Sequence, residues 1–169
     1  LSTNTHSENN VAVGYEALKT FNVGSGSGYN TAVGSIALSL CTTGVNNTAI
    51  GGKALYATTT GLRNVAVGTD CMVSHTTGDD NTAIGTGALA NNTTASNNTA
   101  VGRSALLANT TGDTNTAVGK DSMLSTTPGT NNSAFGARSL DANTTGTNNV
   151  AVGDMALGAN TTANYNTAV

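Results

Sequence analysis

The sequence predicts an all-β protein, a parallel β-solenoid (β-roll) of about nine to ten stacked coils of 17 residues each. Three observations support this fold. A five-residue motif recurs at constant spacing, and a Leu or Met follows every complete copy at the same offset. Charged residues make up 9% and aromatic residues 4% of the chain, so large core-forming side chains are scarce. A thin, elongated core therefore fits better than a thick globular one.

The motif is Asn-[Thr/Val/Ser]-Ala-[Val/Ile/Phe]-Gly. Its first two glycines lie 20 residues apart, and the next seven spacings are all 17. A spacing that is constant over seven steps means that each period does the same structural job and stacks on the one before. The glycines are Gly14, Gly34, Gly51, Gly68, Gly85, Gly102, Gly119, Gly136 and Gly153.

Each period fits two short strands and two turns, because a repeat of two helices needs roughly 33 residues. We assign Asn-Thr-Ala-Val to the first strand, Gly-x-x to a turn, Ala-Leu-x-x to the second strand and Thr-Thr-Gly-x-x to the return turn. Stacked coils would form two parallel sheets with coils about 4.8 Å apart. The three extra residues of the first coil, within 21–29, are expected to form a surface loop.

Three columns should run along the stack. The motif asparagines would form an amide ladder, as in-register parallel strands favour; they include Asn30, Asn47, Asn64, Asn81, Asn98, Asn115, Asn132 and Asn149. Two core columns would comprise Ala49, Ala66, Ala83, Ala100 and Ala117, and Leu38, Leu55, Met72, Leu89 and Leu106.

The first strand of each coil is apolar or small on both faces, since neighbouring residues point to opposite sides. One face can fill the coil interior. The other needs a cover, and a partner chain is the simplest one. Residues 1–9 are interpreted as a leader or the remnant of a preceding segment, and residues 10–169 as the solenoid domain of a longer chain.

The Asn-Thr-Ala-Val-Gly-x-x-Ala-Leu repeat resembles the head repeats of trimeric autotransporter adhesins (the YadA-like head) and similar repeats of phage and bacterial tail-fibre proteins. The resemblance covers residues 10–169. It implies a left-handed β-roll, three chains around one axis, and display on a cell or virion surface. It also implies that the strands from Ala12-Val13-Gly14 to Ala168-Val169 lie near that axis, with the Leu/Met column facing the interior. The 17-residue period is longer than the usual head repeat.

No constellation for catalysis, a cofactor or a metal is recognised, and the chain is predicted not to be an enzyme. His6 and His75 are expected to be solvated loop residues, Cys71 a buried small residue and Cys41 an exposed turn residue. A disulfide between the cysteines is not expected, because they stand in different columns. The net charge of −3 argues against nucleic acid, and no apolar run suggests membrane insertion by this segment.

Glycosylation is a separate hypothesis. Four Asn-x-Thr sequons share one position on the Thr-Thr turn and could carry a row of glycans: Asn92, Asn109, Asn143 and Asn160. The alternative is that sequons arise freely in a chain so rich in Asn and Thr.

The function expected is a structural shaft or head of an extracellular fibre or adhesin that attaches to surfaces through many weak contacts. The partners would be two further copies in a homotrimer or an end-to-end homopolymer, and a host-surface glycan or matrix ligand. One alternative is a self-assembling extracellular fibril without a receptor. A second is a tail spike that binds or cleaves polysaccharide, although Asp70, Asp121 and Asp154 stand in separate coils.

Overall fold

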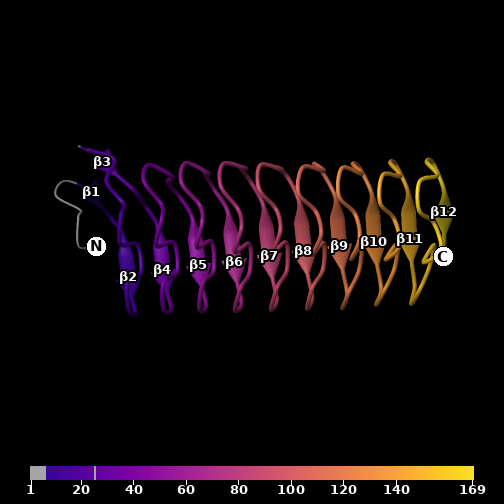
Figure 1. Cartoon of the computed structure of the whole chain (residues 1–169), viewed down its shortest axis with the longest axis horizontal. Helices are drawn as coiled ribbons and strands as arrows, with labels where there is room; N and C mark the ends of the chain where they lie inside the picture. The colour runs from indigo at the N-terminus through magenta and orange to yellow at the C-terminus, as the bar shows by residue number, and fades with distance from the viewer. Residues whose placement is uncertain (1–6, 25) are drawn as a thin grey trace.

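The computed structural model describes residues 7–24 and 26–169 of the chain. It confirms an all-β parallel solenoid, with no helix in the described part. The coils stack along the long axis from β2 to β12, and the two ends of the stack lie at opposite ends of the rod (Figure 1). No helix of the described chain is long and apolar enough to cross a membrane.

Twelve short strands are present in two parallel sheets. The ten-stranded sheet has the order β12-β11-β10-β9-β8-β7-β6-β5-β4-β2, and β1 pairs with β3. The strands are β1 (Ser7–Glu8), β2 (Val11–Val13), β3 (Gly26–Ser27), β4 (Thr31–Val33), β5 (Thr48–Ile50), β6 (Val65–Val67), β7 (Thr82–Ile84), β8 (Thr99–Val101), β9 (Thr116–Val118), β10 (Ser133–Phe135), β11 (Val150–Val152) and β12 (Thr167–Ala168).

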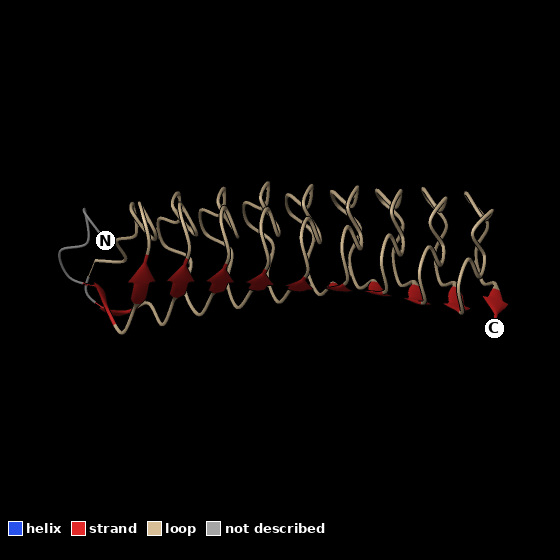
Figure 2. Ribbon diagram, turned by 90° about the horizontal axis from the view of Figure 1, so that it is seen from below, coloured by secondary structure: helices blue, strands red, loops and turns tan. Residues whose placement is uncertain are grey.

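The register of the large sheet follows the repeat. Ala32 pairs with Ala49, and Ala49 pairs with Ala66, so the motif alanines form a continuous column. All ten strands lie on one side of the rod, and the strand direction turns steadily along the stack (Figure 2). The sheet therefore twists, as parallel sheets normally do.

The predicted second strand is absent, and the prediction of two long sheets is wrong in this respect. The Ala-Leu-x-x segment is a series of turns, and the Leu or Met of every coil has a φ between 49° and 52°. A left-handed residue breaks the alternation that a strand requires. The segment still bonds from coil to coil, for example through the N–H of Leu55, which donates to the carbonyl of Cys71 at 3.0 Å.

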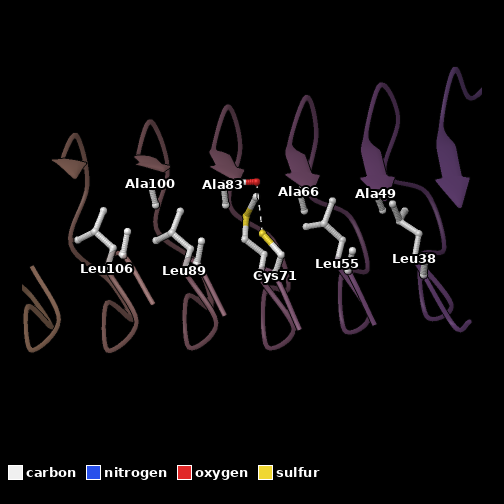
Figure 3. Close-up of a cluster of buried hydrophobic side chains, with 14 of the residues drawn as sticks. Leu38, Ala49, Leu55, Ala66, Cys71, Ala83, Leu89, Ala100 and Leu106 are labelled. Carbon is white, nitrogen blue, oxygen red and sulfur yellow. Dashed lines mark hydrogen bonds between the residues drawn. The ribbon is translucent and has the colours of Figure 1, made fainter. Parts of the chain in front are cut away.

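The interior of each coil holds one Ala from the strand and one Leu or Met from the opposite segment. In Figure 3, Leu55 and Leu89 point across the coil toward the column of Ala66, Ala83 and Ala100. The Ala side chains of the strands are fully buried from Ala32 to Ala151, and the Leu or Met side chains are fully buried from Leu18 to Leu140. Because the space between the walls is only one Ala and one Leu deep, the core is thin and continuous along the rod.

The first coil departs from the rest. Phe21 is fully buried, and Gly26–Ser27, within the predicted surface loop, pairs with Ser7–Glu8 as β3 with β1. Part of the insertion is therefore integrated into the fold as an extra pair of strands beside the stack. Residues 1–6 of the predicted leader, including His6, lie outside the described residues.

Candidate interaction surface

The outward face of the ten-stranded sheet, here called the strand face, is an uncharged surface of the rod with one continuous row of Val, Ile and Phe side chains from β4 to β11. It consists of the first and third residues of each strand, because the middle Ala points inward. Ile50, Ile84 and Phe135 are 41%, 43% and 42% exposed. From β4 to β11 no charged residue stands on this face; the outward residues are Thr, Val or Ser in the first row and Val, Ile or Phe in the second.

Most charged residues of the regular coils lie in the two turns that flank each strand in sequence. The turn after the strand carries Lys53, Asp70, Arg103, Lys120, Asp121, Arg138 and Asp154, and the turn before the next strand carries Arg63, Asp79, Asp80 and Asp113. Several of these charges pair between coils: Nε of Arg63 lies 2.6 Å from Oδ1 of Asp80. This hydrogen bond to Arg63 lowers the pKa of the Asp80 carboxyl. The strand face is thus bordered by charge on both sides.

The motif asparagines form a buried ladder directly before the strands. The backbone N–H of Asn64 donates to Oδ1 of Asn47 at 2.9 Å, and Nδ2 of Asn47 donates to the carbonyl of Gly61 at 2.8 Å. One side chain therefore links successive coils and also ties the start of a coil to the turn near its end. Equivalent backbone-to-side-chain bonds run from Asn30 to Asn166.

The glycine after each strand allows the coils to approach closely. At Gly51 φ is 132°, and an added Cβ would lie 2.5 Å from the carbonyl oxygen of Gly68. An L side chain is excluded there both by its own backbone preference and by the next coil. This explains why the motif ends in Gly in every complete copy.

The residue that precedes the Thr-Thr pair points into the coil, a feature that the sequence analysis missed. In successive regular coils this inner turn column contains Cys41, Thr58, His75, Asn92, Asn109, Thr126, Asn143 and Asn160. All of them except Asn160 are buried. Asn109 exchanges two hydrogen bonds with Gly112, at 2.9 and 3.1 Å, which hold its amide inside the turn.

The burial of this column argues against the predicted row of glycans. Asn92, Asn109 and Asn143 are fully buried, and each Nδ2 donates to a carbonyl of its own turn. A glycan on these nitrogens would require the turn to open. Asn160, in the last coil of the described chain, is partly buried and makes the same bond to Ala163 at 3.1 Å.

His75 and Cys41 are also buried, so both were wrongly expected to be solvated. Nδ1 of His75 lies 3.1 Å from Oγ1 of Thr58, whereas Nε2 has no hydrogen-bond partner. Burial lowers the pKa of His75 to about 4. Burial also raises the pKa of the Cys41 and Cys71 thiols to about 12, and both cysteines are free.

The carboxylates considered for sugar cleavage are not brought together as a pair. Asp121 lies 3.4 Å from Nζ of Lys120, and Asp154 lies 3.7 Å from a guanidinium nitrogen of Arg138. Within the described residues, no group of three or more His, Cys, Asp or Glu side chains is placed to hold a metal ion. Because Asp70, Asp121 and Asp154 stand in separate coils, no catalytic pair is recognised among them.

Comparisons of the chain with protein-family models, with curated proteins and with solved structures found no match. We therefore infer the fold and the surfaces of the chain from its own sequence and structure.

Proposed function

We propose that this chain is a non-catalytic shaft or head segment of an extracellular fibre, in which copies of the chain pack against one another through their strand faces. The observation that carries the proposal is a charge-free apolar face that extends over successive coils, from β4 to β11. The Ile and Phe side chains of this face remain exposed in the described chain.

The physical support is the composition of the strands. A parallel strand that is apolar on both faces is ordinarily buried on both faces, yet each strand here buries only its Ala side. Large continuous apolar patches are uncommon on monomeric proteins and mark interaction sites. The charged turns on either side would then form the polar rim of such an interface, because rims remain hydrated.

The number of copies and the location come from the resemblance of the repeat to adhesin heads and tail fibres. The resemblance to each of these two groups of proteins suggests three chains around one axis and exposure outside the cell or virion. A long rod that repeats the same surface every 17 residues suits attachment by many weak contacts, because linked sites multiply a small affinity.

Sedimentation equilibrium tests the assembly. The expected species of the wild-type chain has three times the protomer mass of 16.6 kDa. Ile84→Lys places a charge in the middle of the strand face and should yield monomers, because a buried unpaired charge is strongly unfavourable. Thr94→Lys, on the exposed Thr-Thr turn, is the matched control and should leave the assembly intact. A monomeric wild-type chain at micromolar concentration would contradict packing through the strand face.

Location is tested separately with antibodies to the folded chain. Immunogold labelling of intact cells or particles from the native source should decorate thin projecting fibres in electron micrographs. Labelling that appears only after lysis would exclude the extracellular fibre and would leave the assembly result unaffected.

A further inference from the structure

A cavity of about 240 Å³ opens on the surface of three successive coils, in the turns that follow β4, β5 and β6. It lies in a charged turn beside the strand face and belongs to neither the Asn ladder nor the core. Its lining residues are Ser35, Ile36, Gly52, Lys53, Thr69 and Asp70.

The cavity exists because one coil lacks a side chain at this position. Gly52 occupies the place directly after the motif glycine, where the neighbouring coils carry Ser35 and Thr69. A Cβ built on Gly52 would meet no atom within 4 Å. The glycine thus leaves open space, in contrast to Gly51, whose added Cβ would collide with the next coil.

Two opposite charges line this cavity without pairing. Lys53 and Asp70 occupy the same position of adjacent coils, and the backbone N–H of Asp70 donates to the carbonyl of Gly52 at 3.0 Å. Within the described residues, neither side chain has an opposite charge within 4.0 Å.

In later coils, ion pairs form between residues at two different positions of this turn. Lys120 and Asp121 lie 3.4 Å apart, and Arg138 and Asp154 lie 3.7 Å apart. Asp121 and Arg138, which hold the same position of adjacent coils as Lys53 and Asp70 do, form no ion pair within 4.0 Å either, so the separation of the two charges follows from their position in the repeat.

Ile36 provides the apolar part of the lining in a strained conformation. Its φ is 52°, and a β-branched residue is a rare occupant of the left-handed region. The equivalent residues of the next two coils, Lys53 and Asp70, also have a positive φ, of 59° and 53°, so this conformation belongs to the repeat. The result is an aliphatic surface beside one cation, one anion and the hydroxyl groups of Ser35 and Thr69.

We propose that this cavity binds a small aliphatic zwitterion, a molecule with one ammonium and one carboxylate group on a short carbon skeleton. The carboxylate would meet Lys53, the ammonium would meet Asp70, and the skeleton would lie over Gly52 against Ile36. The volume is below the 300–1,000 Å³ of typical ligand pockets, so we expect a small ligand that binds weakly. The site does not depend on the fibre proposal.

The test is an NMR titration of the isotope-labelled full chain with leucine as the probe. Saturable shifts of the amides of Gly52, Lys53 and Asp70 are expected. 4-Methylpentanoate lacks the ammonium and isopentylamine lacks the carboxylate, so each should bind at least tenfold more weakly. A shorter and a longer amino acid, glycine and 6-aminohexanoate, measure which charge separation the cavity favours.

Variants decide whether these residues form the site. Lys53→Gln and Asp70→Asn should each weaken leucine binding at least tenfold, and Gly52→Ser should fill the cavity and abolish the shifts. Lys120→Gln, the control in a turn four coils further along the rod, should bind as the wild type does. Shifts that stay linear to 50 mM, or unchanged binding in both charge variants, would overturn the proposal.

Discussion

The backbone N–H of Asn132 donates to Oδ1 of Asn115 at 3.0 Å, one coil before it, and Nδ2 of Asn115 donates to the carbonyl of Gly129 at 2.8 Å. All three residues are buried. A single amide therefore satisfies two backbone groups that water does not reach. Because the groups belong to different coils, the ladder couples each coil to its neighbour.

Asn115→Ala should destabilise the rod by about 2–4 kcal/mol, since it leaves the N–H of Asn132 and the carbonyl of Gly129 buried without these partners. Urea denaturation followed by circular dichroism measures the change. Asn91→Ala is the control, because Asn91 is exposed and stands outside the ladder, and it should change the unfolding free energy by less than about 0.5 kcal/mol. Equal losses in the two variants would show that the ladder contributes nothing specific.

The buried imidazole of His75 predicts a dependence of stability on pH. Its pKa in the folded chain is about 4, below the ordinary value of 6.5, because burial penalises the charged form. The unfolded chain therefore takes up a proton first as the pH falls. Stability should decrease between about pH 6.5 and pH 4, by up to about 3 kcal/mol, and this contribution should be constant below pH 4.

His75→Asn isolates this effect. Asn92 occupies the next place in the inner turn column and bonds both polar groups of Ala95, so an Asn at position 75 should bond Gly78 in the same way. The variant should be less sensitive to pH between 6.5 and 4 than the wild type. Both chains share their carboxylates, so the difference between the two unfolding curves reports His75. Parallel curves would refute the buried, neutral histidine.

The period, the first strand and the Asn ladder could be predicted because each depends on a residue that recurs at constant spacing. The absence of the second strand could not be predicted, because it results from the backbone conformation of the Ala-Leu-x-x segment. Leu55 and Leu89 have an apolar pattern that suits a strand, yet both adopt a left-handed conformation that Leu seldom occupies. Their coil-to-coil hydrogen bonds stabilise this conformation, and these bonds leave no mark in the side-chain pattern.

The candidate sites show the same division. The strand face follows from alternation along Thr48–Ile50 and its equivalents, so its apolar character could be predicted. The inner turn column holds Cys41, Thr58, His75 and Asn92 in succession, and such chemically different residues show no pattern that indicates burial. The cavity beside Gly52 depends on the absence of a side chain and on neighbours 17 residues away, which only the stacked coils bring together.

Left-handed residues offer a route to a more stable rod. Thr114 has a φ of 59°, which is unfavourable for a β-branched residue. The equivalent residues of the two neighbouring coils are Asn97 and Asn131. Asn tolerates this conformation best among residues other than Gly. Thr114→Asn should therefore raise the unfolding free energy by about 1 kcal/mol. Thr111→Asn, at an exposed position without positive φ, should show no such gain in the same denaturation experiment.

The close approach of the coils gives the last prediction. At Gly68 φ is 138°, and an added Cβ would lie 2.7 Å from the carbonyl carbon and oxygen of Gly85. Since the obstacle is backbone, neither coil can yield without breaking the adjoining pairing of β6 with β7. Gly68→Ala should cost about 3 kcal/mol or more, from backbone strain and the contact together.

Gly52→Ala is the matched control for Gly68→Ala, because its Cβ would enter open space without positive φ; its cost should stay below about 0.5 kcal/mol. Coils contact only their neighbours, so the damage in Gly68→Ala should be local. Hydrogen exchange should accelerate at the backbone amides of β6 and β7 and remain slow in β10, where the register is undisturbed. Equal exchange along the whole rod in Gly68→Ala would show that the coils unfold as one unit, and equal stability of the two variants would show that the glycine column does not limit the stacking distance.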